Sequence, residues 1–76
     1  MALIASFEEG KLQNIKLHDA IPAIYFCHEL DGRKLLQINT MGRKTRDIPG
    51  KVSQSIQLDE DTAKQLVEIL TRHFGL

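Results

Sequence analysis

The sequence predicts an α+β domain, in which an antiparallel sheet of four to five strands is followed by one C-terminal helix. Segments between residues 3 and 58 alternate apolar and polar side chains with the period of a strand. Residues 31–32, Asp-Gly, are a strong signal for a two-residue hairpin turn. Apolar residues recur at helical spacing over residues 63–74. We therefore expect a single domain over residues 1–76 with the order β-β-β-β-β-α.

The size and composition limit the class of protein. A chain of 76 residues is near the length at which one core is only marginally sufficient, and dimerisation is a common supplement. An apolar content of 42% and a charged content of 26% are typical of a globular protein. The single cysteine, Cys27, excludes an internal disulfide, which fits a reducing, cytoplasmic setting. Its apolar neighbours predict that it lies in a strand. Residues 1–5 are too short for a signal peptide or a membrane span, so we expect neither secretion nor membrane insertion.

The first third of the chain predicts a hairpin. Residues 3–7 and residues 14–18 both alternate apolar with small or polar side chains. Residues 8–11, Glu-Glu-Gly-Lys, supply a turn between them. Residues 19–22 break the pattern, and residues 23–30 resume it as a third strand rich in β-favouring side chains.

A second hairpin turns at Asp31 and Gly32. Both central positions of a type I′ turn need positive φ, which Asp and Gly tolerate best. A two-residue turn fixes the register of the strands on either side of it. The expected cross-strand pairs are Leu30 with Arg33, Glu29 with Lys34, Cys27 with Leu36, and Tyr25 with Ile38.

This register gives the second hairpin two different faces. The apolar face, which we expect to be core, carries Ala23, Tyr25, Cys27, Leu36 and Ile38. The other face, called the mixed face below, suits a partner surface, a dimer interface or a nucleic-acid platform. The alternative is a partly covered second face of the sheet. The mixed face carries Ile24, Phe26, His28, Leu30, Arg33, Leu35, Gln37 and Asn39.

The C-terminal third predicts a last strand that runs directly into a helix. Residues 52–58 alternate, with the apolar side facing inward. Asp59 is placed as an N-cap, and Glu60 and Asp61 put negative charge where the helix dipole favours it. Gly75 is a natural terminator. The expected apolar stripe of the helix, suited to packing on a sheet, is Ala63, Leu66, Val67, Leu70 and Phe74.

One helix cannot cover both faces of a five-stranded sheet. The uncovered face must be polar, bind a ligand, or pair with a second copy of the chain. On the helix itself, Leu66, Leu70 and Phe74 are a further candidate partner or dimer surface.

The net charge of zero hides an uneven distribution. Residues 1–32 carry a net charge of −3, residues 33–51 carry +5, and residues 52–76 carry −2. A local concentration of basic side chains is what an anion-binding face requires. The alternative is a solvated loop balanced by acidic neighbours. The candidate phosphate contacts are Arg33, Lys34, Arg43, Lys44, Arg46 and Lys51.

Two runs of residues carry a family resemblance. They are residues 26–38, FCHELDGRKLLQI, and residues 55–70, SIQLDEDTAKQLVEIL, and their most specific part is the strand-to-helix junction at residues 56–60. In the order and spacing of their parts, residues 24–72 resemble the PC4 family of single-stranded DNA-binding transcriptional coactivators. The resemblance implies a homodimer whose helices pair and whose curved antiparallel sheets grip single strands.

The resemblance also assigns roles to individual residues. Gly32 and Arg33 match the family's hairpin glycine and the basic residue after it. The loop around Arg43, Lys44, Arg46 and Lys51 falls where the family also has basic side chains, so these cations would contact phosphates. The family's base-stacking aromatics correspond here to Leu30 and Gly42. Stacking would then fall to Phe26, which we take as a candidate site residue, to Tyr25, or to the guanidinium of Arg33.

Catalytic and metal-binding patterns are missing from the sequence. The histidines His18, His28 and His73 have no ligand spacing with Cys27 or with one another. The acidic residues 59–61 are explained by the helix start. We therefore expect no enzyme activity, no metal and no cofactor.

Two functional hypotheses remain. The first is a dimeric, PC4-like protein that binds single-stranded DNA or RNA and acts in transcription or DNA metabolism. The second is a small protein-binding regulator or inhibitor, of the kind found in phages or mobile elements. This alternative would use Ile24, Phe26, Leu30 and Leu35 against a protein partner.

Overall fold

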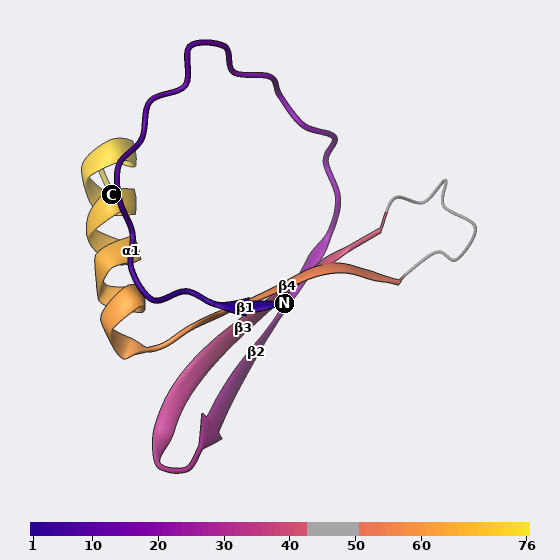
Figure 1. Ribbon diagram of the computed structural model, residues 1–76, viewed down its shortest axis with the longest axis vertical. Coiled ribbons are helices and arrows are strands. Elements are labelled where there is room, and N and C mark those ends of the chain that lie inside the picture. Colours follow the sequence, from indigo (N-terminus) through magenta and orange to yellow (C-terminus); the bar gives the residue numbers. More distant parts are fainter. Residues whose placement is uncertain (43–50) are drawn as a thin grey trace.

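A computed structural model describes residues 1–42 and 51–76 and confirms the predicted α+β class (Figure 1). The described residues form a four-stranded sheet followed by one C-terminal helix, and the strand order is β1-β4-β3-β2. The elements are β1 (Ala2–Leu3), β2 (Ala23–Leu30), β3 (Arg33–Met41), β4 (Val52–Leu58) and α1 (Glu60–Phe74).

The hairpin of β2 and β3 has the predicted register. All four expected pairs are present, from Leu30 opposite Arg33 at the turn to Tyr25 opposite Ile38. Asp31 has a φ of 52° and Gly32 a φ of 77°, so both turn residues lie in the left-handed region. The turn chemistry alone was enough to place these strands.

The rest of the sheet is mixed. Strand β4 pairs with β3 in antiparallel orientation, with an irregularity in register between Thr40 and Met41. Strand β1 pairs with β4 in parallel, with Ala2 opposite Ile56 and Leu3 opposite Gln57. The prediction of an entirely antiparallel sheet is therefore wrong at this edge, since the first strand belongs beside the last one.

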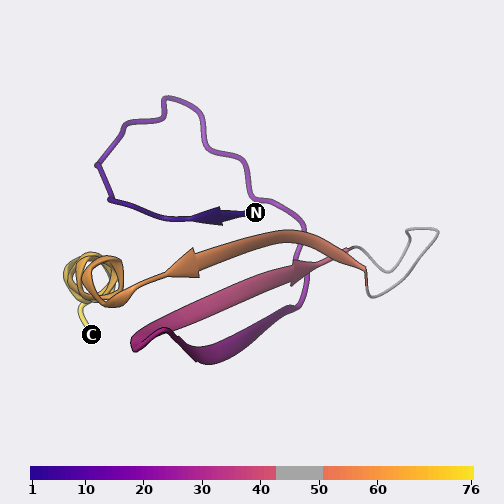
Figure 2. The same cartoon turned by 60° about the horizontal axis from the view of Figure 1, so that its bottom comes forward.

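The predicted first hairpin does not form. Residues 4–22 contain no strand and follow a wide arc from β1 past α1 to β2 (Figures 1 and 2). Leu17, expected in a strand, is 98% exposed. A two-stranded hairpin is marginal in water without further partners. Here the first few residues pair with β4 instead, and the Ile4 N–H donates to the Gln57 carbonyl at 2.9 Å.

Helix α1 begins and ends where the sequence predicted. Asp59 is its N-cap and forms a capping box with Thr62. Gly75 adopts the left-handed conformation, and its N–H donates to the Thr71 carbonyl at 2.9 Å. However, α1 lies beyond the end of β4, beside the sheet rather than across it (Figures 1 and 2). Its apolar stripe therefore lacks the expected sheet beneath it, and Phe74 is 66% exposed.

Little of the described chain is buried. Leu58, at 2% exposure, is the one buried large apolar side chain of the described residues. On the apolar face, Leu36 and Ile38 are half-buried, but Tyr25 is 71% exposed and Cys27 is exposed. The expectation that this whole face is core is thus wrong on β2, because none of residues 1–42 and 51–76 covers that strand.

The exposed surface is large for the mass of the chain. The solvent-accessible area is 7154 Å² for 8.6 kDa, whereas a compact monomer of that mass exposes about 4,700 Å². The radius of gyration is 14.7 Å, against about 11 Å for a compact domain of this length. A single chain therefore leaves much apolar surface uncovered.

The turn at residues 31–32 gives a first prediction. Gly32→Ala should lower the free energy of unfolding by about 1 kcal/mol, because a Cβ is strained at positive φ. Gly10→Ala is the matched control, since an added Cβ meets nothing within 4 Å at either position and only Gly32 has positive φ. Urea unfolding at one protein concentration measures both variants. Equal losses for the two would contradict this account of the turn.

Candidate nucleic-acid interface

The mixed face extends across all the strands of the described sheet. Phe26 lies opposite Gln37, Gln37 lies opposite Gln57, and Gln57 lies opposite Leu3. Paired residues of adjacent strands project to the same side of a sheet. A row of four side chains therefore crosses the mixed face from β2 to β1.

An aromatic pair stands at the β2 end of this row. The rings of Phe26 and His28 are stacked, with centroids 5.8 Å apart and an angle of 14° between their planes. Phe26 is 38% exposed and His28 is also exposed. Sequence reasoning proposed Phe26 for stacking but gave His28 no such role. The spacing of two residues along one strand, which puts both rings on the same face, is the signal that could have identified His28 as well.

Amide side chains form the middle of the row. Nε2 of Gln57 donates to Oε1 of Gln37 at 3.0 Å, and Nε2 of Gln37 donates to Oδ1 of Asn39 at 3.0 Å. All three side chains are half-buried. These hydrogen bonds hold the amides in fixed orientations and leave Oε1 of Gln57 and Nδ2 of Asn39 at the two ends of the chain of bonds. Such groups suit the donor and acceptor edges of a base.

The predicted basic residues do not form one cluster in the described part of the chain. Arg33 and Lys34 lie at the hairpin end, and Lys51 lies at the other end, where its carbonyl accepts from the Gly42 N–H at 2.7 Å. The nine residues of β3 between these ends span about 27 Å at ~3.3 Å per residue. Arg33 is on the mixed face, whereas Lys34 is on the apolar face opposite Glu29.

Three of the predicted phosphate contacts, Arg43, Lys44 and Arg46, lie outside the described residues. Of the other three, Arg33 lies at the hairpin end of the mixed face, Lys34 lies on the apolar face, and Lys51 lies opposite Gly42 at the far end of the β3–β4 pair.

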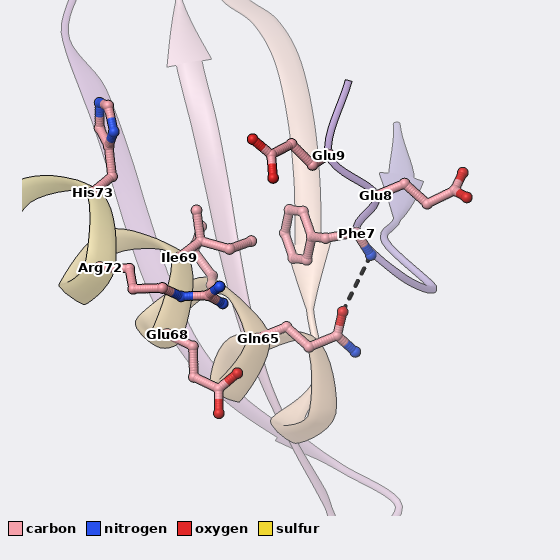
Figure 3. A pocket seen from close by; sticks show the side chains of 9 residues that line it. Phe7, Glu8, Glu9, Gln65, Glu68, Ile69, Arg72 and His73 are labelled. Carbon is pink, nitrogen blue, oxygen red and sulfur yellow. Dashed lines mark hydrogen bonds between the residues drawn. The ribbon is translucent and has the colours of Figure 1, made fainter. Parts of the chain in front are cut away.

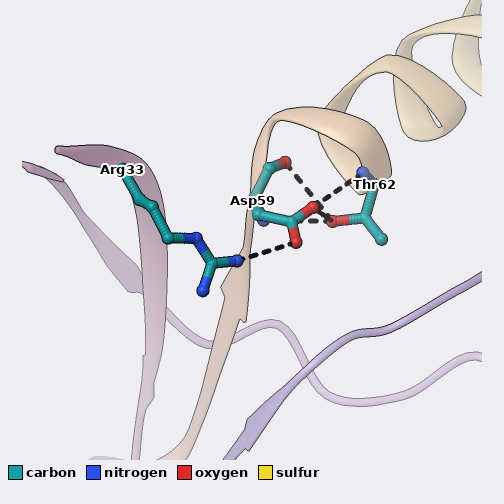
Figure 4. Close-up of polar contacts among 3 residues, drawn as sticks. All are labelled: Arg33, Asp59 and Thr62. Atoms are coloured by element: carbon teal, nitrogen blue, oxygen red, sulfur yellow. Dashed lines mark hydrogen bonds and ion pairs between the residues drawn. The ribbon is translucent and has the colours of Figure 1, made fainter. Parts of the chain in front are cut away.

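Acidic side chains face the two cations at the hairpin end. An open cleft of about 440 Å³ separates the hairpin turn from the start of α1. Arg33 and Lys34 line it, together with four carboxylates. Nη2 of Arg33 lies 3.3 Å from Oδ2 of Asp59 (Figure 4). The four carboxylates are those of Glu29, Asp59, Glu60 and Asp61.

Asp59 is held from two sides. Its Oδ1 accepts from the Thr62 N–H and from the Thr62 hydroxyl, each at 3.1 Å, while Oδ2 faces Arg33 (Figure 4). The Thr62 backbone N–H is the largest influence on the pKa of Asp59. Desolvation opposes it, but the Thr62 hydroxyl and the charge of Arg33 add to it, and the pKa lies below its ordinary value of 3.8. Asp59 is therefore ionised at neutral pH.

A second groove lies between the N-terminal segment and α1. The Phe7 N–H donates to Oε1 of Gln65 at 3.2 Å, and the groove encloses about 750 Å³ (Figure 3). Leu66, predicted as a partner surface, lines this groove and is half-buried. Leu70 and Phe74, predicted for the same surface, are exposed.

Two kinds of feature are absent from the described residues. No group of three or more His, Cys, Asp or Glu side chains in residues 1–42 and 51–76 is arranged to hold a metal ion. Within the same residues, no helix combines the length and the apolar character that crossing a membrane requires.

No protein-family model, curated protein or solved structure matches this chain. The resemblance to the PC4 family therefore stays a prediction from the residues at 26–38 and 55–70.

The pKa of Asp59 gives a second prediction. As the pH falls below about 4, the unfolded chain takes up a proton at Asp59 before the folded chain does, so the free energy of unfolding should decrease. Above that range this contribution is fully present. Asp59→Asn keeps a good N-cap but cannot titrate.

The measurement is urea unfolding from pH 7 to pH 3 for the unmodified protein and the Asn variant. We expect the stability of the unmodified protein to fall more steeply with acid. Parallel curves would show that Asp59 does not have a depressed pKa in the folded state.

Proposed function

We propose that this protein binds single-stranded nucleic acid on the mixed face, and that it acts in transcription or DNA metabolism. The observation that carries the proposal is the exposed Phe26–His28 stack beside a hydrogen-bonded amide row. Single-strand binding modules combine aromatic side chains, on which bases stack, with cations that track the phosphates. Amide groups add hydrogen bonds to base edges.

Cations at both ends of the β3–β4 pair support the same function. Arg33 lies at one end and Lys51 at the other, about 27 Å apart by the length of β3. Arg43, Lys44 and Arg46 precede Lys51 in the sequence and would add to the positive charge available to a strand. A nucleic-acid strand laid along β3 would then have phosphates near the cations at both ends and bases beside the aromatic and amide side chains between them.

The same proposal includes a homodimer. The exposed part of the α1 stripe, which is Val67, Leu70 and Phe74, has no cover in the described chain, and the total exposed area exceeds that of a compact monomer by about half. A second copy that packs along α1 would cover this surface, which agrees with the family resemblance. We further propose a cytoplasmic location, where the exposed thiol of Cys27 would stay reduced.

The protein-binding alternative has one specific observation in its favour. Ile24, Phe26 and Leu30 are exposed on β2, an edge strand with no partner along its outer side in the described residues. Such an edge can accept an extended segment of another protein. The amide row and the stacked rings favour nucleic acid, because a purely apolar partner would leave the amides unused.

Nucleic-acid binding is tested by removing the aromatic platform. Phe26→Ala should weaken binding of a labelled oligonucleotide of about 12 nucleotides by roughly tenfold, because a stacked base contributes about 1–3 kcal/mol. Tyr25→Ala is the control, since Tyr25 is exposed on the same strand but projects to the opposite face. Fluorescence anisotropy at low salt measures all three proteins. Absence of binding by the unmodified protein, or an equal loss in both variants, would reject this function.

The dimer is tested separately. Leu70→Glu should convert a particle of twice the 8.6 kDa chain mass into a single chain, because a charge would be buried in the interface. Thr71→Glu, exposed on α1 but outside the stripe, should leave the mass unchanged. Light scattering coupled to gel filtration gives the masses. A single-chain mass for the unmodified protein would exclude the dimer.

A further inference from the structure

The ion pair between Arg33 and Asp59 connects the proposed binding face to the start of α1. Arg33 is on the mixed face at the hairpin end, and its guanidinium Nη2 is 3.3 Å from Oδ2 of Asp59. The side chain of Arg33 is 60% exposed and that of Asp59 is 25% exposed. The contact is therefore open to solvent and to ligands from the side of Arg33.

A carboxylate and a phosphate are alternative ligands of a guanidinium. Both present oxygen acceptors to the same fork of N–H donors. While one edge of Arg33 faces Asp59, that edge is closed to a phosphate. Asp59 and a phosphate therefore compete for the same N–H donors of Arg33.

The two partners differ in their freedom to move. Asp59 is fixed, because its other oxygen accepts two hydrogen bonds from Thr62, which is fully buried. Turning the carboxylate away would cost the helix its cap. Arg33 has no second hydrogen-bond or ion-pair partner in the described residues. When the pair opens, the arginine moves and the aspartate stays.

The surroundings of the pair repel a phosphate. Glu29, Glu60 and Asp61 line the same cleft as Asp59, and Lys34 is the second cation there. With two cations and four carboxylates, the cleft has a net negative charge. A phosphate that bound Arg33 in its present position would be repelled by these carboxylates. Arg33 must turn out over the mixed face to meet one.

We propose that Asp59 is an internal competitor for phosphate: it holds Arg33 in the free protein and releases it to the backbone of a bound strand. The inference rests on the proposed function, since it concerns regulation of that same face. It assigns Asp59 a role beyond helix capping. A single-stranded nucleic acid that also binds the aromatic and amide groups can displace Asp59 from Arg33, whereas a weakly bound anion cannot.

The test is removal of the charge without loss of the cap. Asp59→Asn should strengthen binding of the labelled oligonucleotide by about three- to fivefold, the range expected for loss of an exposed ion pair. Asparagine is as good an N-cap as aspartate. Glu60→Gln is the matched control, because it removes one negative charge from the same cleft without an ion pair to Arg33 in the described structure. It should strengthen binding by less than about twofold.

A double-mutant cycle shows whether the gain in affinity depends on Arg33. In an Arg33→Gln background, Asp59→Asn should give no more gain than Glu60→Gln, because the released side chain is missing. Circular dichroism checks that each variant keeps its helix. Asp59→Ser, a second neutral cap, replaces Asp59→Asn if that variant does not fold.

The outcomes separate this inference from the proposed function. A gain for Asp59→Asn that disappears with Arg33→Gln supports the competitor role. Binding by the unmodified protein with equal effects of Asp59→Asn and Glu60→Gln, weaker binding by Asp59→Asn, or a gain that persists without Arg33 overturns the role alone. If no variant binds the oligonucleotide, including Asp59→Asn, in which Arg33 is free of the ion pair, both the proposed function and the competitor role of Asp59 are rejected.

Discussion

The junction between β4 and α1 is the contact on which the rest of the described fold depends. Leu58 is the last residue of β4 and Thr62 lies in the first turn of α1, and both are buried. Asp59 connects them, because its side chain and backbone exchange hydrogen bonds with Thr62. The capping box ties the direction of the helix to the end of the strand. It also brings the acidic start of the helix beside the hairpin turn and Arg33.

This junction explains why the sheet is open. A helix that turned back across the sheet would cover one face of it, as the apolar stripe suggested. Here the helix continues beyond the end of β4, and the N-terminal segment lies against it instead (Figures 1 and 3). Both faces of β2 remain exposed. The chain therefore keeps its β2–β3 hairpin by backbone pairing and turn geometry, with little help from a core.

Local signals in the sequence predicted the local structure. The Asp31-Gly32 turn determined the hairpin register, and Asp59 and Gly75 marked the ends of the helix, since each depends on a few neighbouring residues. Non-local pairing was missed. Nothing near Ala2 indicates that it lies beside Ile56, more than fifty residues away in the chain. The amide row was missed for the same reason, because Gln57 meets Gln37 only through the pairing of β3 with β4. Periodicity at residues 14–18 predicted a strand but could not supply a partner strand.

The charges illustrate why position matters more than totals. Residues 33–51 carry a net charge of +5 in the sequence, yet at the hairpin end the structure places four carboxylates around Arg33 and Lys34. The acidic residues are there because a helix start favours negative charge. The same preference places Asp59 within 3.3 Å of the guanidinium that a phosphate would use. A requirement of helix stability thus lowers the attraction for anions at one end of the mixed face. Binding there would depend on contacts with bases as well as on charge, which favours a flexible single strand over a uniformly charged duplex.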